Sequence, residues 1–245
     1  MSLSSIKWWP AALILLFYPA TAWPLTVDKD TAWSGTVDVE GQVTVEKSAT
    51  LTIAPGTVVR FARGGADAEG LADTGLLVKG AVVADGRPGA RIIFTSAVKS
   101  PAPGDWGEVK VFKSTGSSFT DCDFSFGGWG LHVHESDLKV TGCTFTNNSF
   151  GGLRGKAGHV EVEGSTFKGM DIGIRYWRGS PHIHKNTFTE NTTGIFLRQD
   201  CDGARVNFNN IYGNLEYDVK LGDGQKRDVD FRNNWWGTSS VSSGN

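Results

Sequence analysis

The stretch His182-Ile183-His184-Lys185-Asn186-Thr187-Phe188 contains a motif that recurs along the second half of the chain. Its last three residues are a small polar residue, a second residue and a large apolar anchor, and triplets of this kind recur at intervals of 21 to 24 residues. A repeat of this length is typical of proteins that stack one unit on the next. The triplets are Cys122-Asp123-Phe124, Cys143-Thr144-Phe145, Ser165-Thr166-Phe167, Asn186-Thr187-Phe188, Asn209-Asn210-Ile211 and Asn233-Asn234-Trp235.

Each repeat also predicts at least two short strands. An apolar residue precedes the first five anchors by five positions, and a glycine usually opens a second alternating run after the anchor. Alternation of this kind places every second side chain inside. One unit of about 22 residues cannot bury its apolar face alone, so the units must stack. The preceding apolar residues are Phe119, Val140, Val162, Ile183 and Val206.

Residues 33–116 follow the same plan less regularly. Two segments, 62–75 and 97–105, are rich in glycine, alanine, aspartate or proline and are predicted to leave the stack as excursions. We expect eight or nine coils of about 22 residues in one all-β domain. A β-propeller needs about 40 residues per blade, and a leucine-rich solenoid has a leucine signature that this chain lacks. A β-sandwich remains an alternative, although it would not generate an in-register column.

The amino terminus predicts export. Lys7 precedes the apolar run 8–18 and the Ala20-Thr21-Ala22 cleavage motif, as in a secretory signal peptide. The run is too short for a transmembrane helix, which needs around 20 apolar residues. We expect a signal peptide over 1–22 and a mature domain over 23–245, with less regular coils over 23–116, regular repeats over 117–237 and a tail over 238–245. The mature protein is expected to be periplasmic or extracellular, with no membrane span.

Composition excludes some classes of function. The formal net charge is -2, with no strong basic excess, so the chain is not expected to bind nucleic acid. Three cysteines are too few for a disulfide framework in a chain of this size. A hydrophobic core must supply the stability.

The chain resembles the right-handed parallel β-helix proteins of the pectate-lyase-like superfold. Four stretches carry the resemblance: 49–57 (Ala-Thr-Leu-Thr-Ile-Ala-Pro-Gly-Thr), 93–96 (Ile-Phe-Thr-Ser), 104–107 (Gly-Asp-Trp-Gly) and 233–237 (Asn-Asn-Trp-Trp-Gly). The superfold includes polysaccharide lyases, glycoside hydrolases, adhesins and periplasmic proteins that resemble copper-enzyme maturation factors. The resemblance therefore implies the fold and leaves the function open.

One strand face is predicted to carry a basic and aromatic stripe. Outward positions of the glycine-led strands align as His132, Arg154, Arg175 and Phe196, with Lys220 in the next coil. Two positions further along lie His134, Lys156, Trp177 and Arg198. Cations can pair with carboxylates or sulfates of an acidic polysaccharide, and Trp177 offers a ring for a sugar face. Ordinary solubilising charge is the alternative reading.

A second cluster predicts a possible metal site. His182 and His184 point outward from one strand, with Glu161 and Glu163 one coil away. Imidazole and carboxylate groups at this spacing can bind zinc or copper. A surface ladder of mutually paired charges explains the same pattern.

Two of the cysteines occupy the same column. Cys122 and Cys143 lie one coil apart, and the strand spacing falls within the range of Cα separations that a disulfide allows. Two stacked reduced thiols are the alternative, which we favour because parallel in-register strands rarely orient both sulfur atoms correctly. Cys201 has no partner in either case.

These patterns favour a non-catalytic exported β-helix that binds a polysaccharide or another extended anionic partner along the basic and aromatic stripe. The expected partner is an acidic polysaccharide or a cell-envelope component. The resemblance offers a polysaccharide lyase or glycoside hydrolase as the alternative. Polygalacturonase-like enzymes combine paired aspartates with a Gly-His-Gly and an Arg-x-Lys element, and this complete set is not found: Asp200 and Asp202 flank Cys201, but the sequence contains no Gly-His-Gly. Whether the chain is an enzyme stays open, although the sequence favours a protein without catalytic activity. A structural surface component or a periplasmic metal-handling protein is the third possibility.

Overall fold

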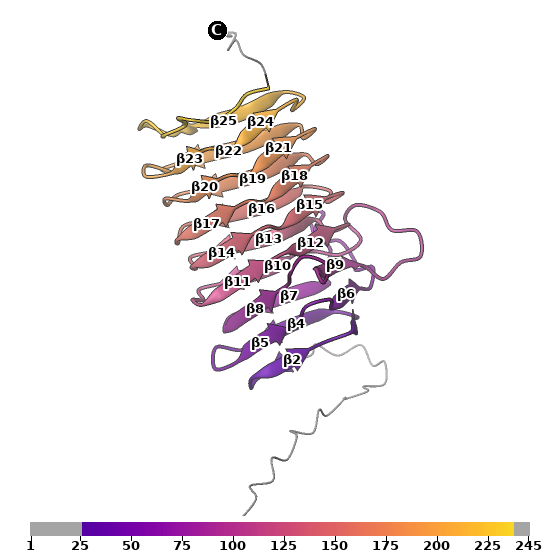
Figure 1. The fold of residues 1–245 in the computed structure, drawn as a ribbon. Coiled ribbons are helices and arrows are strands. Elements are labelled where there is room, and N and C mark those ends of the chain that lie inside the picture. Colours follow the sequence, from indigo (N-terminus) through magenta and orange to yellow (C-terminus); the bar gives the residue numbers. More distant parts are fainter. Residues whose placement is uncertain (1–25, 238–245) are drawn as a thin grey trace, which may run out of the picture.

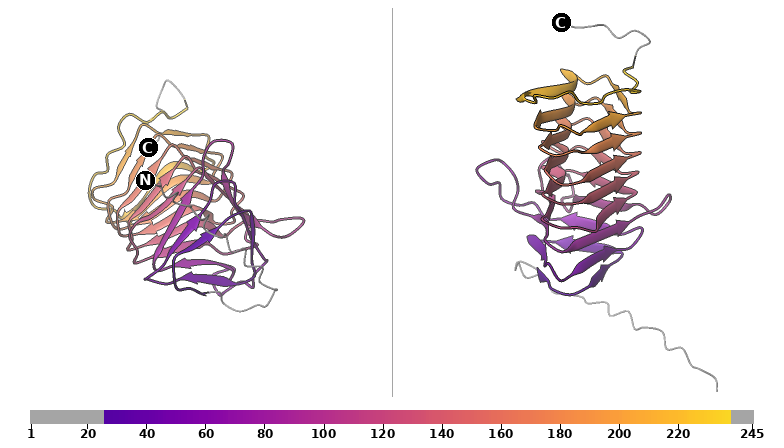
Figure 2. Two further views of the ribbon diagram at one scale, coloured as in Figure 1. Left: turned by 60° about the horizontal axis from the view of Figure 1, so that its bottom comes forward. Right: turned by 90° about the vertical axis from the view of Figure 1, so that its left-hand side faces the viewer.

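The computed structural model describes residues 26–237, which form a right-handed parallel β-solenoid of about nine turns with about 22 residues per turn. The turns lie on one another in a regular stack (Figure 1), and the strands of each face run side by side along it (Figure 2). No helix among these residues is long and apolar enough to cross a membrane. The expected signal peptide, 1–22, and the tail, 238–245, lie outside the described residues.

Three parallel sheets form the faces of the stack, and we call them sheets A, B and C. Sheet A has nine strands: β1 (Thr26–Val27), β4 (Gln42–Val45), β7 (Gly75–Val78), β10 (Val109–Phe112), β13 (Trp129–His134), β16 (Gly151–Lys156), β19 (Ile172–Trp177), β22 (Thr193–Gln199) and β25 (Tyr217–Gly224). Sheet B has eight strands: β2 (Thr31–Trp33), β5 (Thr50–Ile53), β8 (Ala81–Asp85), β11 (Ser117–Thr120), β14 (Leu138–Thr141), β17 (Val160–Glu163), β20 (His182–His184) and β23 (Arg205–Asn207). Sheet C has eight strands: β3 (Thr36–Val39), β6 (Val58–Phe61), β9 (Ile92–Ser96), β12 (Cys122–Ser125), β15 (Thr144–Thr146), β18 (Thr166–Lys168), β21 (Thr187–Thr189) and β24 (Asn210–Tyr212).

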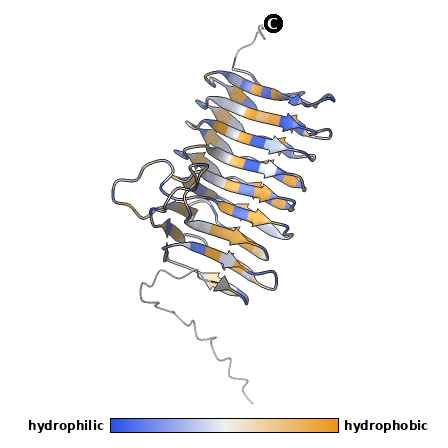
Figure 3. Cartoon of the chain, turned by 180° about the vertical axis from the view of Figure 1, so that it is seen from behind, coloured by the Kyte–Doolittle hydropathy of each residue, from blue (hydrophilic) through white to orange (hydrophobic). Residues whose placement is uncertain are grey.

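The columns predicted from the repeat lie in register inside the stack. In sheet B, Phe119, Val140, Val162, Ile183 and Val206 are paired in succession, and all are buried. Apolar and polar residues alternate along the strands, as the bands of Figure 3 show. The alternation therefore separates the core from the outer faces, as predicted.

A column of aromatic rings runs through the core beside sheet C. Each ring is parallel to the next, with centroids 4.6 to 4.9 Å apart, which is close to the spacing of parallel strands. This column also explains the glycines that open the strands of sheet A, because a Cβ atom at Gly152 would collide with the ring of Phe167. The stacked rings are Phe94, Phe124, Phe145, Phe167 and Phe188.

Asparagine side chains form a hydrogen-bonded ladder at the turn that leads into sheet C. The Asn186 Nδ2 donates to Asn209 Oδ1 at 3.0 Å, and the Asn209 Nδ2 donates to Asn234 Oδ1 at 3.0 Å. Asn186 and Asn209 are buried, so these bonds satisfy amides that water does not reach. A second ladder lies at the turn that follows sheet C, where Asn191 is linked to Asn214 of the next coil.

The last repeat differs from the expected alignment by one residue. We expected Asn233 in the asparagine column and Trp235 as the anchor, but Asn234 joins the ladder, Trp236 packs against the core and Trp235 is half-exposed. Asn233 has a φ of 63°, in the left-handed region that Asn tolerates. Lys185 and Phe208 precede the previous two triplets with the same backbone conformation. Asn233 therefore occupies this turn position, and the coil is one residue longer than expected.

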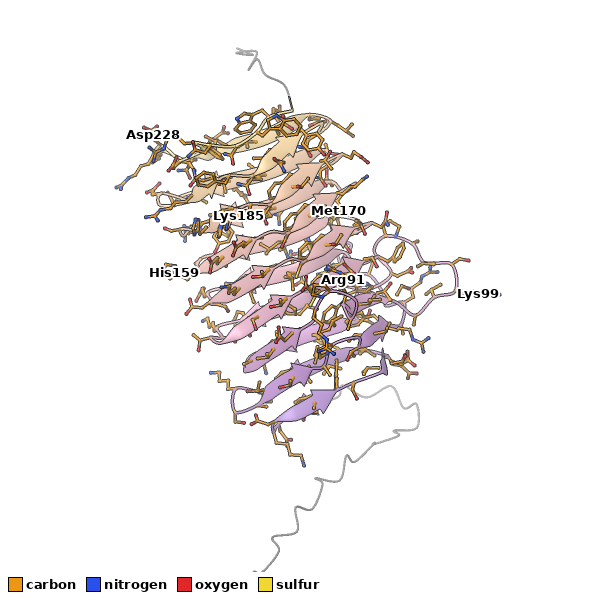
Figure 4. The ribbon with its side chains drawn as sticks, viewed as in Figure 1. Arg91, Lys99, His159, Met170, Lys185 and Asp228 are labelled. Atoms are coloured by element: carbon orange, nitrogen blue, oxygen red, sulfur yellow. The ribbon has the colours of Figure 1, made fainter. Side chains whose placement is uncertain are left out.

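Both predicted excursions leave the stack. Residues 62–74 connect β6 to β7, and residues 97–108 connect β9 to β10. The loop that contains Lys99 projects away from the solenoid (Figures 1 and 4). The two excursions are joined by Arg63, whose Nε donates to the buried carboxylate of Asp105 at 2.6 Å. They contact the stack beside sheet A, where Leu71 lies next to Gly128.

Candidate functional site

The outer face of sheet A brings the predicted stripe together. Strand pairing places His132, Arg154, Arg175, Phe196 and Lys220 in one column. A second column aligns His134, Lys156 and Trp177, and the Arg198 guanidinium lies 5.5 Å from the centre of the Trp177 ring. The stripe residues therefore share one surface, whatever that surface binds.

A buried carboxylate that the repeat did not reveal lies within this stripe. Glu108 accepts hydrogen bonds from His132 Nδ1 at 2.8 Å and from Arg154 Nε at 2.9 Å, and its side chain is 9% exposed. It precedes Val109, which pairs with Leu131, so it occupies the position that Gly130 has in the following coil. A glutamate that interrupts a column of glycines is the sequence signal that could have identified it.

At this cluster, burial and the contact between Glu108 and His132 shift the pKa of each residue in opposite directions. Burial acts to raise the pKa of Glu108, but the hydrogen bonds and charges of His132 and Arg154 keep that pKa below its usual value. Burial lowers the pKa of His132 and outweighs the opposite effect of Glu108. The Glu108 carboxylate is therefore ionised at neutral pH, while His132 is mainly neutral there and binds Glu108 through Nδ1.

The guanidinium groups of Arg154 and Arg175 lie over the ring of Trp129. Its ring centre is 5.9 Å from the Arg154 guanidinium, 5.0 Å from the Arg175 guanidinium and 6.4 Å from the ring centre of Phe150. Burial, followed by the charges of Arg154 and Arg198, lowers the pKa of Arg175. Arg175 forms no ion pair with any residue in 26–237. A partly buried guanidinium without a counter-ion is a ready partner for a carboxylate or sulfate.

Towards the carboxyl end of the stripe, cations lie over aromatic rings. Lys156, Arg178 and Arg198 lie 4.7, 5.0 and 5.5 Å from the centre of the Trp177 ring. Lys220 lies 5.6 Å from the centre of Phe196 and 4.8 Å from that of Tyr217. Such contacts are weak where they are exposed. Trp177 therefore has cations around its ring before any ligand arrives.

The predicted metal cluster lies on sheet B. Ligand atoms of Glu161, His182 and His184 lie within 4.8 Å of one another. Glu163, which we also expected there, instead accepts a hydrogen bond from Lys185 at 2.8 Å, and its carboxylate is 3.9 Å from His184 Nδ1. Three of the four expected ligands are thus close together.

All three cysteines are free and buried. The possible disulfide between Cys122 and Cys143 is not formed, and the reduced-thiol alternative describes the structure. Each thiol donates to a backbone carbonyl of the preceding coil, from Cys122 to Ala84 and from Cys143 to Phe119. Burial raises the pKa of Cys122, and it raises that of Cys201 to about 11, so these thiols are poor nucleophiles.

Family models cover nearly all of the described solenoid. Residues 108–236 match the right-handed β-helix region, and residues 25–123 match the pectate-lyase-like β-helix domain. No curated protein matches the sequence. The first match spans more than half of the chain and agrees with the observed handedness and strand pairing, so the chain belongs to the right-handed β-helix family.

Proposed function

We propose that the outer face of sheet A binds an acidic polysaccharide along the axis of the solenoid. One observation carries the proposal: most cations on the strands of this face have no carboxylate partner within residues 26–237, whereas Arg154 pairs with Glu108. The unpaired cations are Lys110, Lys156, Arg175, Arg198 and Lys220. A polymer with regularly spaced anionic groups supplies the missing counter-charges.

Strand spacing supports a linear ligand. Successive parallel strands are about 4.8 Å apart, so neighbouring cations along a column repel one another unless water or an anion separates them. The charges of Arg154 and Arg198 already lower the pKa of Arg175, after burial, which reflects this repulsion. A bound carboxylate or sulfate would relieve it and would form charge-assisted hydrogen bonds with the guanidinium group.

The aromatic residues of the stripe suit a sugar ligand. Trp177 lies among Lys156, Arg178 and Arg198, and Phe196 lies under Lys220. When the cations turn towards anionic groups of the ligand, the aromatic faces become free to pack against sugar rings. The proposed site is therefore a long, shallow surface of alternating cations and rings.

A second candidate function is cleavage of that polysaccharide, and the Glu108–His132 pair favours it. A mainly neutral imidazole that is oriented through Nδ1 by a buried carboxylate leaves Nε2 as a possible general base. Arg175, two coils away in the same column, could neutralise a uronate carboxylate. This arrangement has the elements of a lyase, and polymer shortening distinguishes it from binding alone.

Affinity electrophoresis tests both functions. The protein is run through gels that contain polygalacturonate or a neutral glucan, and the polymer is then examined for shortening. We expect retardation by the acidic polymer only, with intact polymer, and loss of retardation in the triple variant Lys156→Gln, Arg175→Gln, Arg198→Gln. The matched control is Arg60→Gln with Lys168→Gln on sheet C. Equal retardation of the triple variant and wild type would refute the proposed surface.

Proteins with pectate-lyase-like β-helix domains are typically extracellular or periplasmic. Our proposal places this chain there too, because the predicted signal peptide and an acidic-polymer ligand both fit an exported protein. Fractionation of cells that express the full chain tests the location. The chain is expected outside the cytoplasm, and retention of the unprocessed chain in the cytoplasm would contradict export.

A further inference from the structure

The outer face of sheet B carries two histidines and two glutamates on the neighbouring strands β17 and β20. β20 is three residues long, and its central residue, Ile183, points into the core, so His182 and His184 point outward. β17 lies beside β20, with Glu161 opposite His182 and Glu163 opposite His184. The repeat thus places two imidazoles and two carboxylates on four adjacent positions of one face.

The side chains within this group are already close. The imidazole rings of His182 and His184 are stacked, with centroids 4.3 Å apart and planes inclined by 24°. His184 Nε2 lies 3.4 Å from Glu161 Oε1, which crosses diagonally from its own position opposite His182. The His182 backbone belongs to the sheet B ladder, but its imidazole ring forms no hydrogen bond with another residue of 26–237. Its ring nitrogens are therefore available to a ligand.

We propose that Glu161, His182 and His184 bind one divalent transition-metal ion of the zinc and copper class. Two imidazole nitrogens and one carboxylate oxygen form a donor set that suits these ions, and three protein ligands leave a coordination position for water or another molecule. In a tetrahedral site with metal–ligand distances of about 2.1 Å, donor atoms lie roughly 3.4 Å apart. The ligand atoms of the three residues lie within 4.8 Å of one another, so binding of the ion requires side-chain rotations that bring them closer.

Neighbouring cations set a limit on the affinity of this site. Lys139 Nζ is 3.7 Å from Glu161, and Arg205 is paired with His182 in the next coil. The positive charge of Arg205, on the strand next to His182, repels a metal ion. Its removal should therefore tighten binding.

Glu163 provides an internal control for this site. It has the same chemistry as Glu161 and lies on the same strand, but it is engaged by Lys185, which Figure 4 labels on the turn after β20. A metal that binds through the proposed set depends on Glu161 and depends little on Glu163. A metal attracted by negative charge alone depends on both carboxylates equally.

The test is titration of the tag-free, chelator-treated full chain with Zn²⁺ by calorimetry, together with Cu²⁺ electron paramagnetic resonance. We expect one ion per chain and a Cu²⁺ spectrum with nitrogen coupling. His182→Asn, His184→Asn and Glu161→Gln should each weaken binding by more than the roughly 10- to 100-fold lost with an outer-shell partner. Glu163→Gln should stay near wild type, and Arg205→Gln should bind more tightly.

Three results would overturn the proposal. They are absence of binding to the wild type, unchanged binding in both histidine variants, and equal losses in Glu161→Gln and Glu163→Gln. Circular dichroism melts establish that each variant is folded, and Asn and Gln replacements on the outer face of sheet B leave the residues of the core unchanged. Affinity electrophoresis on the same variants separates this site from the polysaccharide surface, because retardation by polygalacturonate should not change.

Discussion

Sheets A and C belong to the same coils, but they differ in how the charged side chains on their outer faces are paired. Every charged side chain on the strands of sheet C forms an ion pair with a described residue, as Arg60 does with Asp38 and Lys168 with Glu190. On the strands of sheet A, only Arg154 among the lysines and arginines has such a partner. A face that neutralises itself needs no ligand, whereas an unbalanced face is available to one. The position of counter-charges, rather than net charge, distinguishes the two surfaces.

The largest effect is expected when the one carboxylate of the sheet A cluster is removed. Glu108→Gln removes the ion-pair partner of Arg154 and leaves that guanidinium beside Arg175, in a place that is largely screened from water. Loss of one partner from a buried ion pair costs about 3 to 5 kcal/mol, and the partial exposure of Arg154 places the expected loss at the lower end of this range. Urea denaturation measures this change, and a loss below about 1 kcal/mol would show that the cluster does not need the carboxylate.

A smaller effect is expected when one unpaired cation is removed. Arg175→Gln should weaken binding of polygalacturonate about tenfold, because a charge-assisted hydrogen bond contributes roughly 1.5 kcal/mol. The same exchange at Arg60, which Asp38 already neutralises, should leave binding unchanged. Retardation measured over a series of polymer concentrations gives both affinities. Equal losses of affinity in the Arg175 and Arg60 variants would show that the two faces do not differ in binding polygalacturonate.

The pH dependence of stability sharpens the comparison further. The folded-state pKa of His132 is below its usual value of 6.5, so the unfolded chain binds more protons as the pH falls. Stability from the neutral imidazole is present above pH 6.5 and is lost as the pH falls below it. The lowered pKa of Glu108 acts in the same direction below its usual value of 4.5. Wild type should therefore lose more stability than His132→Gln between pH 7 and pH 5 in urea titrations.

The smallest effect is expected on sheet C. Glu190→Gln repeats the chemistry of Glu108→Gln at an exposed pair with Lys168, whose nitrogen lies 3.0 Å from the carboxylate. Exposed ion pairs contribute little, so the free energy of unfolding should change by less than about 0.5 kcal/mol. The same urea titration checks it. A loss of unfolding free energy as large as that of Glu108→Gln would mean that solvent exposure of the ion pair does not determine how much it contributes to stability.

The repeat predicted most of the fold because each coil must present the same side chains to its neighbours. The apolar column from Phe119 to Val206 and the alignment of the stripe follow from this constraint, whereas the composition of the two excursions predicted where the repeat is interrupted. The register of the last coil did not follow, because Asn233-Asn234 and Trp235-Trp236 each offer two equivalent alignments. Only the backbone conformation of Asn233 decides between them.

The candidate site was harder to predict, because its central residues do not repeat. Glu108 and Trp129 each occur once in columns that hold other residue types in later coils, and their contacts depend on side-chain directions that spacing does not give. Spacing likewise suggested Glu163 as a metal ligand, but it cannot show that Lys185 engages that carboxylate. Periodicity identifies a shared face and leaves the partners on that face undetermined.

Because of the parallel ring column and the asparagine ladders, the number of coils can change without a change in how neighbouring coils pack. Each coil presents matching rings, amides and strand edges above and below, so an inserted copy of one coil would find complementary neighbours on both sides. Such an insertion lengthens sheet A by one strand without changing any existing contact except at the junction. The length of the outer face of sheet A can therefore change while the contacts that hold successive coils together stay the same.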